Sequence, residues 1–288
     1  MRGGGRLDRG GRRGPPPGGR RWGGLGLGLA LLLSAPAAHA WHDSLQRSTD
    51  YTAETLGDDE IRLGLWRSGY GFTDWIQIET VAPLWALRLA NAEGKMALRI
   101  DDAWSYAFSL GFVAWNLKDT PGTEVEQNLT LFSLPIAATL SWRADDFTLS
   151  TTARYVPVWL GGEGEADDSD LEALGAYSTL SAGLAAEWRL TRSFALVLEG
   201  RMLVFEVIVA NASTRTEIDD DTTVVVHGSS EVDLQQDLRG YGTLSAFWSY
   251  DHFNLRLGLG YGNPVVPTLG TFVPVLIPVP ELDLFWRF

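Results

Sequence analysis

The sequence predicts an all-β fold, and within that class a transmembrane antiparallel β-barrel of up-and-down topology with about twelve strands. Apolar residues alternate with small or polar residues through most of the chain after residue 40, as in the stretch FNLRLGLGYG at 253–262. Aromatic residues recur at both ends of these stretches. The same part of the chain has no apolar run of about 18 residues, which argues against helical membrane spans.

Residues 1–40 predict a cleaved secretory signal peptide. A basic stretch over residues 1–21 precedes a short apolar stretch at 25–33, and small residues follow up to Ala38-His39-Ala40. The apolar stretch is too short for a bilayer that needs roughly 20 residues in a helix, although an anchoring helix is the alternative. The expected domains are therefore a signal peptide at 1–40 and a single barrel domain at 41–288.

The predicted mature segment is strongly acidic. The whole chain has a net charge of −13, and removal of residues 1–40 takes away seven arginines and one aspartate, which leaves −19. This charge argues against a nucleic-acid partner. The chain has no cysteine, so neither disulfides nor a lipid-anchored cysteine are expected. No motif indicates a cofactor or a metal site.

The predicted strands follow the alternating stretches in chain order. They lie near 50–56, 60–67, 75–82, 95–101, 104–116, 128–142, 147–160, 175–189, 194–209, 239–250, 253–262 and 279–288. Tight connections at 143–146, 190–193 and 250–252 contrast with long ones at 117–127, 161–174, 210–238 and 263–278. One end of a closed barrel is therefore expected to differ from the other. An even strand number is expected; twelve fits the length, and ten or fourteen remain possible.

Aromatic side chains near the strand ends predict two girdles at the membrane surfaces. Pairs spaced about eight to twelve residues apart on tilted strands span roughly 25 Å, the height of the apolar belt of a membrane barrel. The residues assigned to the girdles are Trp104, Trp115, Trp159, Trp188, Tyr261, Trp286 and Phe288. The alternative is a secreted β-sandwich, but a sandwich places its apolar face inward and gives no reason for large aromatics at both ends of successive strands.

The last eight residues, ELDLFWRF, predict the strand that closes the barrel. Lipid offers no hydrogen-bond partner to a free strand edge, so the last strand must pair with the first. Three apolar residues are expected to face lipid and three charged residues the interior, namely Leu282, Leu284 and Trp286 against Glu281, Asp283 and Arg287.

A terminal alternating strand that ends in Phe288 resembles the assembly signal of bacterial outer-membrane β-barrel proteins. The resemblance covers residues 41–288 as architecture and identifies no subfamily. It implies secretion to the periplasm and insertion into the cell outer membrane by the barrel assembly machinery, with both termini and the tight turns in the periplasm. Outer-membrane lipid and lipopolysaccharide are then the surroundings, and we expect a monomer.

Residues with the opposite parity to the large apolar ones are expected to line the lumen, and they carry both signs of charge. The charged set is Arg62, Glu79, Arg99, Arg154, Glu187, Arg189, Arg256, Asp283 and Arg287, with Gln77, Thr152, Asn254 and Glu281 of the same parity. One interpretation is a polar passage for small solutes. The other is a set of interior ion pairs that brace and block a narrow barrel. Residues 194–209 are ambiguous, since Glu199 and Arg201 share parity with Leu203 and Phe205.

The long connections allow several interpretations. Acidic segments at 161–170 and 217–223 are expected to be solvated, with divalent cations that bridge lipopolysaccharide as the alternative. The connection at 210–238 predicts its own hairpin about Asp219-Asp220-Asp221.

The apolar segment 263–280 contains Pro274, Pro278 and Pro280 at equal parity, so their missing N–H groups weaken one side of the closing strand. If that side faces the first strand, one hypothesis is a loose seam through which an apolar molecule leaves into lipid. The other is a Pro-rich loop folded over the barrel mouth.

The expected function is passive or facilitated passage of a small solute across the outer membrane. The alternatives are a closed structural or surface-binding barrel that acts through its acidic loops, and a surface hydrolase. A hydrolase needs a Ser–His pair with a third group that orients the imidazole. His42, His227 and His252 lie before the first strand, in a long loop and in a tight turn. We therefore expect no enzyme and assign no catalytic residue.

Overall fold

The computed structural model of the chain contains a closed antiparallel β-barrel. It describes residues 48–118, 126–166, 169–219, 222–232, 239–250, 252–265, 273 and 275–288. The chain divides into two units, residues 1–38 and 39–288, and the barrel belongs to the second. The predicted signal peptide at 1–40 falls outside the described residues.

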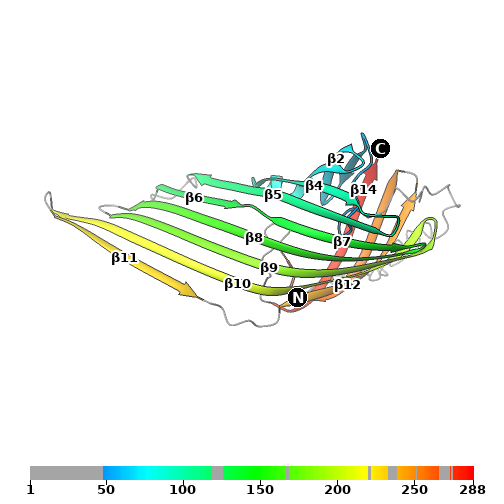
Figure 1. Ribbon diagram of the computed structural model, residues 1–288. Helices are drawn as coiled ribbons and strands as arrows, with labels where there is room; N and C mark the ends of the chain where they lie inside the picture. Colours follow the sequence, from blue (N-terminus) through cyan, green and yellow to red (C-terminus); the bar gives the residue numbers. More distant parts are fainter. Residues whose placement is uncertain are drawn as a thin grey trace, which may run out of the picture. The chain divides into compact units, whose positions relative to one another are not determined.

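The barrel wall consists of fourteen strand segments (Figure 1). They are β1 (Ile61–Gly64), β2 (Arg67–Thr73), β3 (Ile76–Val81), β4 (Ala90–Arg99), β5 (Trp104–Lys118), β6 (Glu126–Ser133), β7 (Ile136–Ala144), β8 (Phe147–Ala166), β9 (Ser169–Thr191), β10 (Phe194–Asp219), β11 (Thr222–Val232), β12 (Gly240–Tyr250), β13 (Phe253–Gly262) and β14 (Ile277–Arg287). One short helix, α2 (Ala82–Ala86), lies between β3 and β4. Among the described residues, no helix has the length and apolar character needed to cross a membrane.

The fourteen segments occupy twelve positions around the barrel. β6 and β7 follow one another along one position, since both pair with β5 on one side and with β8 on the other. β11 and β12 also follow one another along one position, since both pair with β10 at different parts of its length. The predicted twelve-stranded up-and-down barrel is therefore confirmed. Pro135, which has no N–H to donate, lies at the interruption between β6 and β7.

The closing strand is the predicted one. β14 pairs antiparallel with β1, with Arg62 opposite Arg287 and Gly64 opposite Phe285. Ile61 and Phe288 exchange two backbone hydrogen bonds of 3.0 Å each. The chain therefore uses its last residue to complete the ring of hydrogen bonds that lipid cannot supply.

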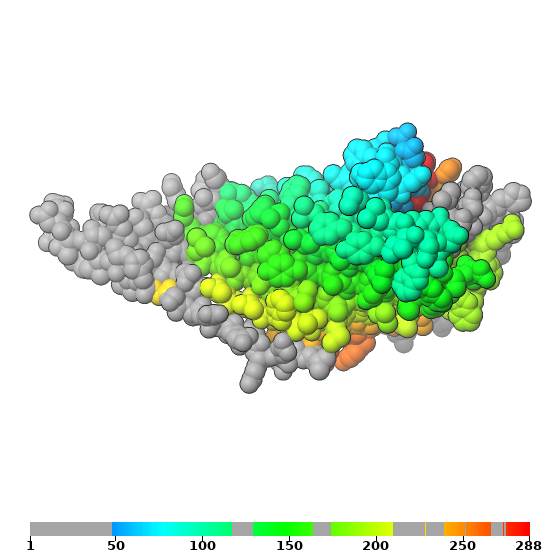
Figure 2. Space-filling view, viewed as in Figure 1, coloured from blue at the N-terminus to red at the C-terminus, as the bar shows by residue number. Residues whose placement is uncertain are grey.

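Alternation places apolar side chains outside and small or polar ones inside. In β5, Trp104, Phe108 and Phe112 are exposed, whereas Ala107 and Val113 are buried. The long middle strands, green to yellow in Figure 2, pack into a continuous wall on the face shown. An exposed apolar surface on a closed barrel is the surface that lipid covers in a membrane.

The predicted strand at 50–56 is wrong. Residues 48–56 lie inside the barrel, where most of their side chains are buried, and they form no strand. The missing position is taken by β2, whose sequence RSGYGFT lacks clean alternation because its glycines carry no side chain. The predicted strand at 60–67 likewise ends early, since β1 stops at Gly64 and the chain turns at Leu65 and Trp66.

The middle strands extend beyond the membrane-spanning length at one end. β8, β9 and β10 have 20, 23 and 26 residues, whereas a tilted strand needs about 9–11 to cross a bilayer. The predicted hairpin within 210–238 is present as β10 and β11, with Thr216 opposite Val224 (Figure 1). The acidic side chains at 164–170 and at 217–221 lie outside the described residues or side chains.

The register at the seam predicts a specific crosslink. Leu63 and Trp286 lie opposite one another on β1 and β14, so the double variant Leu63→Cys, Trp286→Cys is expected to form a disulfide in the folded barrel. The chain has no other cysteine, so a mobility shift in denaturing electrophoresis reports this bond alone. The variant Leu63→Cys, Leu284→Cys, which is two residues out of register, is the control. Equal oxidation of the two variants would contradict the register.

Candidate functional site

A segment of the chain crosses the lumen of the barrel. We call residues 48–56 the strap. The backbone N–H of Ala53 donates to Ser141 Oγ of β7 at 2.7 Å, and that of Leu56 donates to Gln77 Oε1 of β3 at 2.6 Å. Tyr51 packs in a buried cluster with wall residues that include Val197 of β10. Since these strands lie at separate positions around the barrel, the strap bridges the lumen between them.

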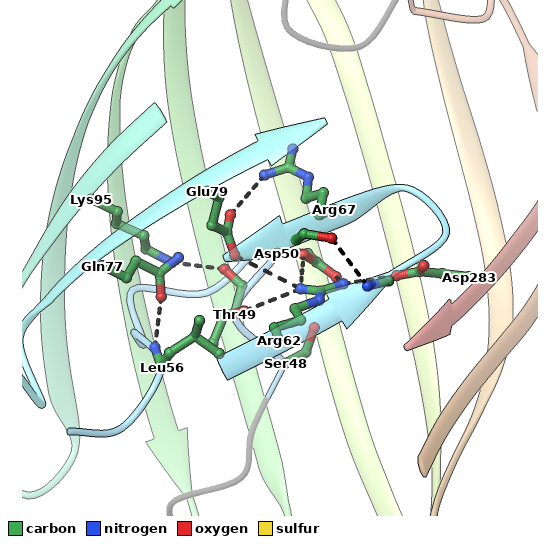
Figure 3. Close-up of polar contacts among 12 residues, drawn as sticks. Ser48, Thr49, Asp50, Leu56, Arg62, Arg67, Gln77, Glu79, Lys95 and Asp283 are labelled. Atoms are coloured by element: carbon green, nitrogen blue, oxygen red, sulfur yellow. Dashed lines mark hydrogen bonds and ion pairs between the residues drawn. The ribbon is translucent and has the colours of Figure 1, made fainter. Parts of the chain in front are cut away.

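Lys95 of β4 holds the strap through its backbone. The ammonium donates to the carbonyl oxygens of Thr49 at 2.7 Å, Thr52 at 2.7 Å and Glu54 at 2.5 Å (Figure 3 draws the bond to Thr49). An ammonium has three donors on one atom and can serve three carbonyls that converge on one point, whereas a guanidinium spreads its donors over three nitrogens in one plane. Lysine is therefore suited to this position, although arginine is the usual cation in this chain.

Arg62 of β1 is the centre of a buried ion-pair network. Its guanidinium lies 2.6 Å from Asp50 of the strap, 2.8 Å from Asp283 of β14 and 3.9 Å from Glu79 of β3 (Figure 3). The side chain is 1% exposed and lies over the ring of Phe285 at 4.0 Å. A single side chain therefore links the strap to both strands of the closing seam.

Other ion pairs cross the lumen. Arg154 of β8 donates to both carboxylate oxygens of Glu93, at 3.2 and 2.9 Å, although β5 and β7 separate the two strands along the wall. Arg256 of β13 lies 3.2 Å from Glu199 of β10, on the far side of β12, and it also pairs at 2.5 Å with Glu281 of the neighbouring strand β14. A buried charge without a partner is costly, and these pairs distribute both signs around the strap.

The structure places eight of the nine predicted lumen charges inside the barrel. Each is paired, and together they are Arg62, Glu79, Arg154, Glu187, Arg189, Arg256, Asp283 and Arg287. Arg99 is the exception, because it lies at the end of β4, where its side chain is 65% exposed and pairs with Asp102 of the following turn. Arg99 belongs to the barrel rim. That the other eight line an open passage remains a prediction.

The structure places all but one of the predicted girdle residues on the outside of the barrel. Six of them are exposed on the barrel exterior, namely Trp104, Trp159, Trp188, Tyr261, Trp286 and Phe288. Trp115 is a correction, since it shares parity with buried Val113 and is only half-buried opposite Leu131. The spacing of eleven residues from Trp104 is odd, which places the two side chains on opposite faces of β5.

A cavity of about 270 Å³ lies beside the strap and reaches the seam. Its walls combine charged, polar and apolar residues, which are Asp50, Tyr51, Trp66, Arg67, Val81, Arg154, Glu199, Arg201, Tyr241, Arg256, Val265, Pro280, Glu281, Leu282 and Asp283. A smaller space of about 50 Å³ lies against Thr49–Thr52 and Lys95. The strap thus occupies part of the lumen, and a sizeable cavity lies beside it.

The histidines provide no assembled catalytic group within the described residues. His252 lies in the turn before β13, where its Nδ1 is 2.8 Å from the carbonyl oxygen of Arg287 and its ring stacks on Phe288. His42 and the side chain of His227 fall outside the description. His252 therefore contributes to the packing of the barrel end that holds the C-terminus.

Sequence reasoning missed both the strap and Lys95. The strap sequence STDYTAETL mixes Ser, Thr and acidic residues with Tyr51, Ala53 and Leu56, and its partial alternation predicts a strand. Lys95 has the same parity as Arg99 on one strand, so the parity argument applies to it equally. Its rarity was a further signal, since Lys95 and Lys118 are the chain's two lysines.

No family model and no curated protein matches this chain. Solved structures to which it is similar include the translocator domain of the autotransporter NalP from Neisseria meningitidis, at 12% identity and a TM-score of 0.32, covering 80% of this chain and 86% of that one. The P. putida toluene transporter TodX has 10% identity and a TM-score of 0.30, with 81% and 80% covered. The ferric yersiniabactin uptake receptor FyuA from Yersinia pestis has 13% identity and a TM-score of 0.36, with 77% and 36% covered. Scores this low carry no functional argument, so the barrel assignment rests on the strand pairing and the apolar exterior.

The ion-pair network predicts unequal effects of removing two arginines. Arg62→Gln leaves Asp50 and Asp283 without their counter-charge in the lumen, so the free energy of unfolding is expected to fall by roughly 3–5 kcal/mol. Arg99→Gln removes an exposed pair and is expected to cost less than about 1 kcal/mol. Urea unfolding in lipid vesicles, followed by tryptophan fluorescence, measures both. Similar losses would show that Arg62 is not the centre of the network.

Proposed function

We propose that this protein lets a small solute pass the outer membrane by way of the luminal cavity, with the strap as the barrier. The observation that carries the proposal is the cavity of about 270 Å³ beside the strap. Pockets for drug-sized ligands occupy roughly 300–1,000 Å³, so this one suits a smaller molecule. Its mixed lining can hold one polar group and one apolar group of a solute.

The strap supports a gated passage over a permanently open one. Its contacts with β3, β4 and β7 on one side and with Arg62 and Arg256 on the other hold it across the lumen. Most of these contacts are hydrogen bonds and ion pairs between groups that water can also solvate, and Tyr51 in addition packs in the buried cluster and under the Arg256 guanidinium. Passage through the length of the barrel therefore requires the strap to shift.

The proposal includes the surroundings of the barrel. The short turns and the C-terminus face the periplasm after insertion by the barrel assembly machinery, and the long strands β8–β10 face outward among lipopolysaccharide. The barrel acts as a monomer and without catalysis. We infer this orientation of the barrel in the membrane from the difference between its two ends, since outer-membrane barrels keep short turns on the periplasmic side and longer loops outside.

A closed structural barrel is the second candidate. The observation in its favour is that the lumen charges are paired with one another and with the strap. Interior ion pairs of this kind brace a barrel whether or not anything passes through it.

Conductance of the mature protein, residues 41–288, in a planar lipid bilayer separates the two candidates. The native barrel is expected to open rarely, and Lys95→Ala is expected to open at least several times more often, because three strap carbonyls lose their donor. Arg99→Ala, which removes a rim cation, is the matched control and should behave as the native protein. Silence from folded native and Lys95→Ala barrels alike would favour the closed structural barrel.

Ion selectivity tests whether the lumen charges face the conducted ions. Arg154→Ala leaves Glu93 without its partner, so the lumen gains negative charge and the reversal potential in a salt gradient should shift toward cation selectivity. Arg99→Ala again serves as the rim control, with a smaller shift. An unchanged reversal potential for Arg154→Ala in conducting channels would place the ion path elsewhere.

A further inference from the structure

We infer that the luminal cavity opens sideways into the bilayer, and that its ligands are small amphipathic molecules with an apolar body and one polar group. The opening, which we call the portal, lies between the upper part of β14 and the β1–β2 turn at Leu65 and Trp66. The inference rests on the proposed function, because it gives the same cavity a solute class and a route.

The wall is too low at the portal to cross a bilayer. β1, β2 and β3 have 4, 7 and 6 residues, whereas a tilted transmembrane strand needs about 9–11. The flanking strands β4 and β14 have 10 and 11 residues and do reach this length. Helix α2 (Ala82–Ala86) follows β3 and contacts β4, so the lowest part of the wall lies beside β14.

The height of the β1–β2 turn follows from its contacts with β14. Leu65 donates its N–H to Leu284 O, and the indole N–H of Trp66 donates to Leu282 O at 2.5 Å. Leu282 is six residues from the C-terminus. Six residues at about 3.4 Å each, on a strand tilted by ~45°, rise about 14 Å, and the apolar band is roughly 25 Å tall. About 10 Å of the band therefore lies above the turn.

β14 has an edge above the turn that pairs with no other described strand. The bonds of Phe288 and Leu284 to β1 show that even-numbered residues of β14 direct their backbone polar groups toward β1, while Arg287 N–H bonds to His252 O on the β13 side. Pro278 and Pro280 have even parity, and β13 pairs with β14 as far as Ile277. The missing N–H groups of both prolines therefore face the portal.

These prolines allow an open edge to exist in lipid. A backbone N–H that faces hydrocarbon without a partner costs several kcal/mol, so a free strand edge in a bilayer is normally closed. Proline has no N–H, so Pro278 and Pro280 remove two of the donors that would otherwise be unsatisfied at this edge. The hypothesis of a loose seam requires that the proline side of β14 faces the first strand. Pro278 and Pro280 meet this condition.

The chemistry of the rim and of the cavity determines the class of ligand. Exposed apolar side chains surround the portal on the outside, among them Leu65, Leu276 and Leu282. Charged groups of the same cavity lie behind it, including Arg67, Glu281 and Asp283. A molecule with an apolar body and a polar group matches both surfaces, whereas a fully polar solute would have to cross the apolar rim and a pure hydrocarbon would leave the charges unsolvated.

Trp66 closes the lower edge of the portal. Its indole bonds to β14 and its carbonyl oxygen accepts from the N–H of Ala82 at the start of α2, so this residue joins the two sides of the gap. It lies on the lining of the cavity and is also 43% exposed. Removal of its ring therefore widens the portal without changing the long-loop end of the barrel.

The test uses a single cysteine in the cavity of the mature protein. Arg201→Cys places a thiol on the cavity lining in a chain that has no other cysteine. Pyrene maleimide, which partitions into the vesicle bilayer, reports entry from lipid, and a sulfonated maleimide reports entry from water. Trp66→Ala is expected to raise the rate of pyrene labelling several-fold and to leave the aqueous rate unchanged, with Trp66→Phe in between, since it keeps a ring but loses the donor to Leu282.

Trp75→Ala is the matched control, because Trp75 is similarly exposed, at 48%, but lies beyond the opposite end of β2. Both rates should match the native background in this variant. Heat-modified electrophoretic mobility confirms that each variant is folded. Labelling by the aqueous reagent alone, unaffected by Trp66→Ala, would overturn the portal but leave the channel proposal intact. Failure of both reagents in folded protein would overturn the portal, and silent conductance traces would separately overturn passage through the lumen.

Discussion

The hydrocarbon of a bilayer offers no donor and no acceptor, and the wall of this barrel is arranged around that constraint. The ring is complete where β1 meets β14, down to the bonds that Phe288 makes with Ile61. Where β1 stops, the constraint is met differently, because prolines on β14 have no N–H and the Trp66 indole reaches a carbonyl in place of a backbone donor. One barrel can therefore have a closed ring of hydrogen bonds where β1 meets β14 and an open portal above the β1–β2 turn.

The interior follows a second constraint, which is that a buried charge needs a partner. A ring of twelve strands encloses more space than its inward side chains fill, and the strap occupies part of that space. Arginines and carboxylates pair across the lumen and with the strap, so removal of water from these groups is offset by ion pairs and hydrogen bonds. The contacts that hold the strap in the lumen are therefore the ones that must change if a solute is to pass along the axis of the barrel.

Several residues show where the alternation of apolar and polar residues does not suffice to predict which face of a strand a side chain occupies. In β10, Glu199 and Arg201 share parity with Phe205, yet Glu206 is buried inside. A register irregularity between Leu203 and Phe205 shifts the strand by one residue and exchanges its faces. Trp115 was placed at the wrong face for a simpler reason, an odd spacing from Trp104. β2 was missed because glycine contributes no side chain to either face.

The sequence by itself determined the closed barrel, its closing strand and most of the charged residues inside, because alternation between lipid and lumen is a local property of each strand. The predicted number of twelve strands agrees with the structure because the wrong strand at 50–56 offsets the missed β2. It also placed the prolines of β14 at one parity. Only the tertiary structure decided which neighbour those prolines face, that residues 48–56 cross the lumen, and that Lys95 and Arg62 hold them there. The physical reason is that these features depend on contacts between residues far apart in the chain, and the strap's bonds to distant strands leave no periodic pattern in its own sequence.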